Sequence, residues 1–171
     1  KLIKNGQKIG IKYFVLPLVD QSSIKNKKQE NQLIKNIKKF KKILKNDVKI
    51  LFEIDYKPEK IIEFMKMLNS SKFGINYDTG NSAGIGYDFN DEKSYFKYVK
   101  NIHLKDKKLK GNTLRLGKGD FDFKNFFKFI KKINYKGNFI LQSARSKKNK
   151  DQYELNLNRN YICRFLWKKK F

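Results

Sequence analysis

Four polar side chains of ligand type stand at or just after the ends of four successive apolar runs. They are Glu53, Asp78, His103 and Gln142. Two carboxylates, an imidazole and an amide oxygen are donors that a hard or borderline divalent cation accepts. The spacing therefore predicts one metal site, provided that the fold brings the four run ends together.

Further polar residues adjoin these ends and are candidates for binding a substrate. They are Asn81, Lys105, Asp106 and Arg145. Asn81 could equally cap the next element, and Arg145 could equally form a structural salt bridge. A single carboxylate at a strand end is more often a cap or an ion-pair partner than a ligand, so the prediction depends on convergence.

The apolar runs are short and rich in β-branched and aromatic residues, which is typical of buried strands. Helical patterns separate them, at about residues 28–45, from Pro58 to Leu68, at about 91–99, after Asp122, and from Tyr153 to Phe165. Alternating strands and helices predict a parallel α/β sheet in a single domain over residues 1–171. In such folds, ligands bind at the carboxyl ends of the strands. The predicted strands are Ile11–Val19, Val48–Ile54, Phe73–Tyr77, Val99–Leu104 and Asn138–Leu141.

The net charge of +25 raises the question of nucleic-acid binding, but only four of the 41 basic residues are arginines. Base readout and bidentate phosphate contacts favour arginine, and the lysines are dispersed along the chain. We therefore expect a solvated lysine surface that helps attract phosphorylated substrates, and no specific nucleic-acid binding. No apolar run is long enough to cross a bilayer. The single cysteine, Cys163, and the lack of a signal-like start favour the cytoplasm.

Several segments together resemble the sugar phosphate isomerases and epimerases of the xylose-isomerase-like, apurinic-endonuclease-like barrel superfamily. They are GINYDTGN (74–81), NIHLKD (101–106), LGKGDFDF (116–123) and YKGNFIL (135–141). Of these, DTGN combined with HLKD is the most specific. The resemblance implies a (β/α)8 barrel of TIM type that binds one divalent metal, Mn or Mg, or else Co or Zn.

The resemblance also implies roles for individual residues. Three metal ligands carry over to Glu53, Asp78 and His103. The fourth ligand in most relatives is a glutamate, and Gln142 stands in that place, within a segment similar to the L-Q-x-A-R segment of one subgroup. Isomerisation next to a carbonyl removes a C–H proton and stabilises an enediolate, and Glu53 is the expected base. An amide cannot act as a base, so either one base does both steps or Lys105 or Asp106 supplies the second.

Two other interpretations remain open. A basic, DNA-binding endonuclease barrel needs a three-metal site, and this chain has one histidine in all. A closed barrel needs eight strands and about 250 residues, whereas five strands are predicted in 171 residues. We therefore expect an incomplete barrel, the C-terminal portion of a longer enzyme, without about three N-terminal βα units. On its own it would be a non-catalytic fragment whose open edges favour self-association.

Overall fold

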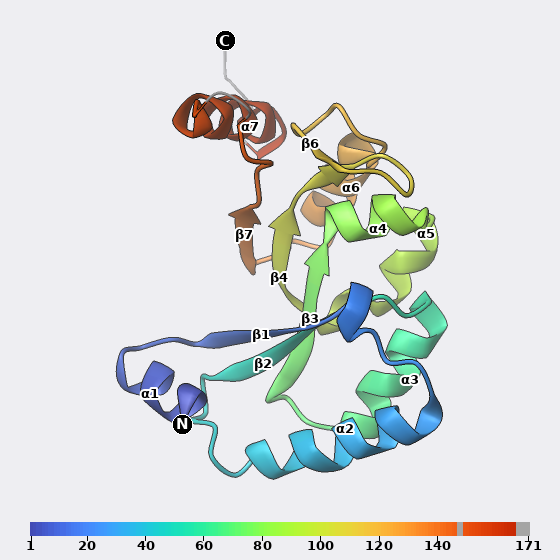
Figure 1. The fold of residues 1–171 in the computed structure, drawn as a ribbon, viewed down its shortest axis with the longest axis vertical. Helices are drawn as coiled ribbons and strands as arrows, with labels where there is room; N and C mark the ends of the chain where they lie inside the picture. Colours follow the sequence, from blue (N-terminus) through green and yellow to red (C-terminus); the bar gives the residue numbers. More distant parts are fainter. Residues whose placement is uncertain (147–148, 167–171) are drawn as a thin grey trace. The chain divides into compact units, whose positions relative to one another are not determined.

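The computed structural model describes residues 1–146 and 149–166, and its centre is a five-stranded sheet of order β1-β2-β3-β4-β7 (Figure 1). The strands β1 and β2, β2 and β3, and β4 and β7 pair in parallel. This confirms the predicted α/β architecture, with each strand boundary within two residues of its expected place. The strands are β1 Tyr13–Leu18, β2 Lys49–Ile54, β3 Phe73–Asp78, β4 Val99–Leu104 and β7 Asn138–Leu141.

Helices connect the strands, as expected, and three features appear that the sequence did not predict. They are the short helix η1 (Asp20–Ser22), helix α4 (Thr79–Ile85) and an antiparallel hairpin of β5 (Asp106–Lys107) with β6 (Thr113–Leu114). Among the described residues, no helix has the length and apolar character that crossing a membrane requires. The other helices are α1 Leu2–Lys8, α2 Lys27–Phe40, α3 Pro58–Leu68, α5 Phe89–Glu92, η2 Lys93–Tyr98, α6 Phe123–Lys132 and α7 Asp151–Leu166.

The chain forms two compact units, and each has its own core. Unit 1 contains Lys1–Asn76 and Ser94–Lys100, and unit 2 contains Tyr77–Lys93 and the described residues from Asn101 onward. In unit 1, strand β2 is central, and its Phe52 is fully buried against Phe64 of α3, with ring centroids 5.2 Å apart. Helix α3 begins with a proline in its first turn, where the missing N–H costs nothing.

Helix α2 differs from its expected form in length and in its buried face. The sequence spacing predicts an inner face of Leu33, Ile37, Phe40 and Leu44. Ile37 and Leu44 are buried, as expected, whereas Phe40 ends the helix and is 37% exposed, and Ile34 is buried in place of Leu33. The chain leaves the helix after Phe40, before Leu44. Constant helical spacing therefore does not predict which side chains face the core in this segment.

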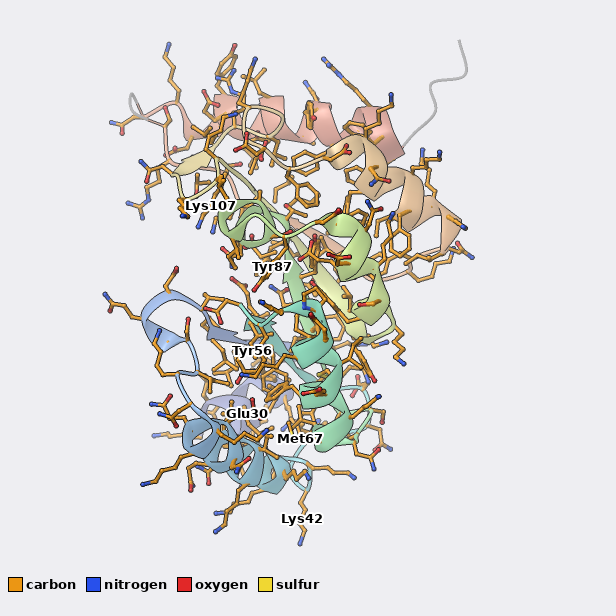
Figure 2. The ribbon with its side chains drawn as sticks, turned by 90° about the vertical axis from the view of Figure 1, so that its right-hand side faces the viewer. Glu30, Lys42, Tyr56, Met67, Tyr87 and Lys107 are labelled. Carbon is orange, nitrogen blue, oxygen red and sulfur yellow. The ribbon has the colours of Figure 1, made fainter. Side chains whose placement is uncertain are left out.

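A buried carboxylate in unit 1 links two helices. Glu30 of α2 is 1% exposed and accepts a 2.7 Å hydrogen bond from the hydroxyl of Tyr56, which precedes α3 (Figure 2). Lys27 donates to its other oxygen at 2.5 Å, and Lys60 of α3 lies 3.6 Å away. Lys60 also lies over the Tyr56 ring. The buried charge is thus both paired and hydrogen-bonded, the condition under which a carboxylate is tolerated inside a protein.

The core of unit 2 is largely aromatic. Asp122, after which the sequence predicts a helix, caps α6 by accepting a 3.0 Å hydrogen bond from the Asn125 amide. The buried face of α6 includes Phe126 and Phe127, and Phe126 stacks on Tyr77 of β3 with centroids 6.0 Å apart. This packing of α6 on the end of β3 holds the part of the strand from which Asp78 follows.

Caps explain the short helices of unit 2. Asp78 caps α4 by accepting from the Asn81 amide at 2.8 Å, and the helix ends at Gly86 in the left-handed conformation with φ of 86°. The next helix was expected at about residues 91–99, with Asn90 as its cap. Instead Asp88 caps α5 by accepting from the Asn90 amide at 2.7 Å, so the helix starts two residues earlier, at Phe89.

Candidate metal and substrate site

Asp78 ends β3 and is nearly fully buried, with a side-chain exposure of 1%. Its Oδ1 is committed to the cap of α4. Its Oδ2 lies 4.0 Å from Nδ1 of His103 and 3.8 Å from Nζ of Lys105. One residue thus combines two tasks, since one oxygen holds the helix start and the other faces an imidazole and an ammonium group.

His103 and Gln142 meet across β4 and β7, as the parallel register requires. His103 pairs with Ile140, so Gln142, two residues further, lies on the same side of β7. The Gln142 amide nitrogen lies 2.9 Å from Nδ1 of His103, and the Gln142 backbone N–H donates to the carbonyl of Leu104 at 3.0 Å. Rotating the amide by half a turn would present its oxygen at the same place, so Gln142 can offer either a donor or an acceptor beside His103.

Glu53 lies at the end of β2 and is held by a residue that the sequence did not single out. The side chain of Asn76 donates to Oε2 of Glu53 at 2.8 Å, and Asn76 is 2% exposed. Asn76 and Asp78 are two residues apart on β3, so their side chains leave the same face of that strand. An asparagine buried two positions before a candidate ligand could have been noticed in the sequence as a polar residue inside an apolar run.

In unit 2, Nδ1 of His103 and Oδ2 of Asp78 lie 4.0 Å apart, and Glu53, at the end of β2 in unit 1, is the third candidate ligand. Two carboxylate oxygens and one imidazole nitrogen fit Zn²⁺, Mn²⁺ and Mg²⁺ chemistry, with zinc favoured by the nitrogen and magnesium by the oxygens. The donor set therefore fits a single divalent cation, with Gln142 beside His103 as the amide donor of the predicted set.

Thr79 fastens the end of β3 to the end of β4. It is fully buried, and its hydroxyl accepts from the Lys105 backbone N–H at 2.9 Å while donating to the Lys105 carbonyl at 2.5 Å. Asp78 precedes Thr79, and His103 is two residues before Lys105. The hydroxyl thus fixes the separation of the two candidate ligands, a role that the D-T-G-N pattern alone did not reveal.

A second buried network holds the segment on both sides of Asp78. Glu92 of α5 is 2% exposed and accepts hydrogen bonds from the hydroxyls of Tyr77 and Ser82, both at 2.6 Å. Tyr77 immediately precedes Asp78, and Ser82 lies in α4, which Asp78 caps. Because the network restrains the residue before Asp78 and the helix after it, Asp78 has little freedom to move.

Asp106 holds a loop, which differs from the substrate-binding or basic role that the sequence suggested. Its carboxylate is fully buried and accepts backbone N–H groups from Gly117 and Gly119 at 2.8 Å and from Phe121 at 3.3 Å. A Cβ on Gly119 would lie 2.1 Å from Oδ1 of Asp106, so only glycine fits there. We therefore assign Asp106 to the conformation of the glycine-containing loop.

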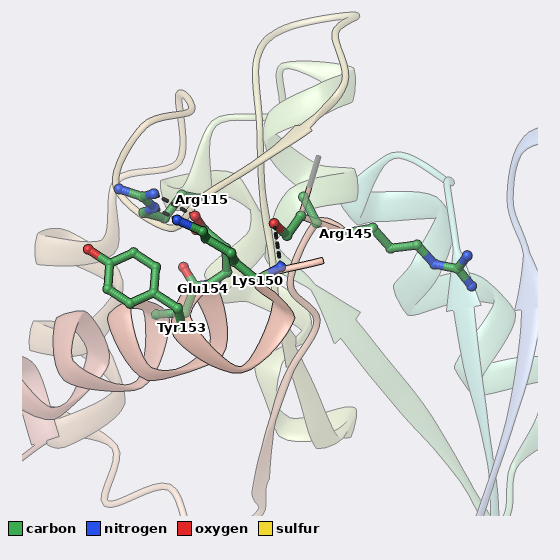
Figure 3. Close-up of a pocket in the computed structure, with 8 residues that line it drawn as sticks. Arg115, Arg145, Lys150, Tyr153 and Glu154 are labelled. Atoms are coloured by element: carbon green, nitrogen blue, oxygen red, sulfur yellow. Dashed lines mark hydrogen bonds and ion pairs between the residues drawn. The ribbon is translucent and has the colours of Figure 1, made fainter. Parts of the chain in front are cut away.

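The other expected substrate-binding residues differ in how exposed they are; they are Lys105, Asn81 and Arg145. Lys105 is 20% exposed in its side chain, and its stem crosses Gly80, where an added Cβ would meet it at 2.6 Å. Asn81 is half-buried in the first turn of α4. Arg145 is exposed beside a pocket, and its side chain extends away from the other labelled residues (Figure 3). Lys105 and Asn81 both approach the candidate ligand Asp78, the first with its ammonium group 3.8 Å from Oδ2 and the second with its backbone N–H 2.8 Å from Oδ1.

Comparison with known proteins identifies the family to which the chain belongs. The sequence profile of the family described as Xylose isomerase-like TIM barrel matches residues 1–160. The chain belongs to this family, and its parallel five-stranded sheet is an incomplete barrel of TIM type. A comparison of the sequence with curated proteins finds no match.

Solved structures share this fold at low sequence identity. A xylose isomerase domain protein from Planctomyces limnophilus superposes with a TM-score of 0.80 at 18% identity, over 95% of this chain and 63% of that one. The IOLI protein with a bound zinc atom gives 0.78 at 16%, over 96% and 66%. An L-ribulose 3-epimerase gives 0.74 at 15%, over 96% and 66%. The chain thus spans about two thirds of the length of these structures.

Proposed function

We propose that this chain carries the metal site of a sugar or sugar-phosphate isomerase or epimerase that uses one divalent cation. The observation that carries the proposal lies within unit 2, where Asp78 faces His103 at 4.0 Å and the Gln142 amide lies beside the same histidine; Glu53 of unit 1 is proposed as the further ligand. The structures of similar fold include an L-ribulose 3-epimerase and a protein with bound zinc, which supports this class of ligand and cofactor.

The proposed residues have separate tasks. The cation, when bound, would act as a Lewis acid on the oxygens of a sugar carbonyl and its neighbouring hydroxyl. Glu53 is the proposed base that removes the proton from the carbon between them, and Asn76 holds one of its oxygens at 2.8 Å and so orients the other. Asp78 and His103 are proposed ligands, and Asp78 keeps its position because its other oxygen caps α4.

Return of the proton requires a second group or the same base acting twice. Gln142 has no useful acid or base function, and the carboxylate of Asp106 is bound to loop N–H groups. Lys105 is the remaining proposed donor, because its ammonium lies 3.8 Å from Oδ2 of Asp78. Asn81 and Arg145 are proposed to contact substrate hydroxyls or a charged end. The proposed setting is cytoplasmic, in keeping with the one cysteine, Cys163.

The proposal is tested by metal binding and proton exchange on the whole protein. Asp78→Asn is a sharp probe, because asparagine caps a helix as well as aspartate does but lacks the charge that a cation needs. We expect Asp78→Asn to weaken Mn²⁺ or Zn²⁺ binding in calorimetry while the thermal midpoint changes little. Glu53→Gln should reduce deuterium exchange from D₂O into aldose and ketose substrates by at least about 100-fold.

The matched control is Glu59→Gln, which removes a carboxylate from the exposed first turn of α3. It should leave both metal binding and exchange unchanged. Equal metal affinity in Asp78→Asn and the parent would refute the metal site. Equal exchange in Glu53→Gln and the parent would refute Glu53 as the base.

A further inference from the structure

A pocket of about 350 Å³ lies in unit 2 between the start of α7, the segment after β7 and the glycine-containing loop (Figure 3). Its volume falls at the lower end of the range of small-molecule sites. It is separate from the group of candidate metal ligands, none of which lines it. The lining residues are Arg115, Ala144, Arg145, Ser146, Lys150, Tyr153, Glu154 and Asn158.

Hydrogen bonds fix the walls of this pocket. Asn158 of α7 is 1% exposed, its Oδ1 accepts from the Leu116 backbone N–H at 2.9 Å, and its Nδ2 donates to the Ser143 hydroxyl at 2.7 Å. One buried side chain therefore joins the loop wall to the wall that follows β7. The Ser146 hydroxyl also accepts from the Lys150 N–H at 3.0 Å. The pocket is thus shaped in advance, which lowers the entropic cost of binding a ligand.

The charges around the pocket are mostly positive. Three cationic side chains and one carboxylate line it. Nε and Nη2 of Arg115 donate to the two oxygens of Glu154 at 2.8 and 2.7 Å, which orients the guanidinium group and leaves further N–H donors on it. In Figure 3, Arg115, Lys150, Tyr153 and Glu154 gather on one side, whereas the side chain of Arg145 extends the other way.

We propose that this pocket binds the anionic group, phosphate or carboxylate, of a small molecule. Arg115 offers the remaining donors of a planar fork held in place by Glu154, and Lys150 offers an ammonium group beside it. Such groups match the oxygens of a phosphate or carboxylate. Tyr153, which is 59% exposed, can add a hydroxyl donor at the rim. This binding depends only on the pocket and does not require the proposed metal.

The position of the pocket adds a substrate class to the proposed function, and this further step depends on that function. Ala144 of the pocket wall follows Gln142 by two residues, a separation of at most about 7 Å along the chain. Gln142 in turn contacts His103. A sugar with a phosphate or carboxylate at its far end could therefore place that end in the pocket and its carbonyl end toward His103.

The test measures binding of inorganic phosphate and of malonate to the full chain by calorimetry and by amide chemical shifts. Lys150→Gln and Arg115→Gln should each weaken binding about ten-fold, the amount expected from losing one charge-assisted hydrogen bond. The matched control is Arg159→Gln, since this arginine is exposed on the same helix and does not line the pocket. It removes the same charge and should change the dissociation constant less than about two-fold, because solvent and salt screen distant charges.

The outcomes separate the proposals. Saturable binding weakened only by the two pocket variants supports the pocket, and the tighter of phosphate and malonate identifies the anion. Binding that does not saturate by about 10 mM, or that all three variants weaken equally, would show only the attraction of a chain of net charge +25 and would overturn the proposal. Lys150→Gln should bind metal like the parent, so loss of the metal site and loss of the anion site are seen independently.

Discussion

Replacing Asp106 by asparagine tests whether its carboxylate holds the glycine-containing loop or takes part in catalysis. In the structure, two backbone N–H groups, from Gly117 and Gly119, share Oδ2, and that of Phe121 approaches Oδ1. Asparagine keeps one acceptor oxygen and turns an NH₂ group toward at least one of these donors. A hydrogen bond to a charged group contributes about 1.5–3 kcal/mol, so losing one or two should lower the free energy of unfolding by about 2–5 kcal/mol.

The measurement is equilibrium unfolding in urea, combined with hydrogen exchange of individual amides. The amides of Gly117, Gly119 and Phe121 should lose protection in Asp106→Asn well before the rest of unit 2. Asp120→Asn is the matched control, because Asp120 is exposed, accepts from the Leu109 N–H and pairs with a surface lysine. Its expected cost is below about 1 kcal/mol.

The result that refutes this reasoning is specific. If Asp106→Asn unfolds within about 1 kcal/mol of the parent and keeps loop protection, the carboxylate does not hold the loop. If it also stops proton exchange into sugar substrates, Asp106 acts in chemistry, as the sequence alone suggested.

Two further predictions follow from buried hydrogen bonds. Thr79→Val keeps the shape of the side chain but leaves the Lys105 N–H without its acceptor, so it should lower the free energy of unfolding by about 1–3 kcal/mol. Thr79→Ser keeps the hydroxyl and should retain most of that stability. Equal stability of the two variants would contradict the link between β3 and β4. Burial by itself raises the pKa of Glu30, but hydrogen bonds from Lys27 and Tyr56 lower it overall, below the usual 4.5. The stability that this carboxylate contributes is present above pH 4.5 and is lost as pH falls through its lowered pKa. Tyr56→Phe should therefore make the free energy of unfolding depend less on pH in this range. The control Tyr153→Phe, at an exposed tyrosine, should leave the pH dependence unchanged.

The strands and the main helices could be predicted because local pattern and burial agree in them. Strand β7 lies at its predicted residues, Asn138–Leu141, and α3 has its predicted bounds, Pro58–Leu68. Helix α4 could not be predicted, since TGNSAGI has two glycines and no amphipathic face. It forms because Asp78 caps its start and Gly86 takes the left-handed conformation at its end.

The candidate ligands could be found from order and residue type, whereas the supporting contacts could not. Glu53, Asp78 and His103 stand at strand ends, and a parallel fold gathers such ends at one edge of the sheet. The hydrogen bonds of Asn76 and Thr79 depend on the register of neighbouring strands, which hydrophobic periodicity in the sequence does not predict. The pocket lined by Arg115 and Lys150 likewise joins segments far apart in the chain.

The alternation of strands and helices could be inferred from the sequence, as could the family and the side chains able to bind a cation. These features depend on hydrophobic period and on the donor atoms that each residue carries. The partner of each polar group, in contrast, depends on how the chain folds. Asp78 and Asp106 are both carboxylates near strand ends, yet one faces an imidazole and the other is enclosed by the N–H groups of a glycine loop. A carboxylate accepts whatever donors surround it, and chain folding alone brings those donors close.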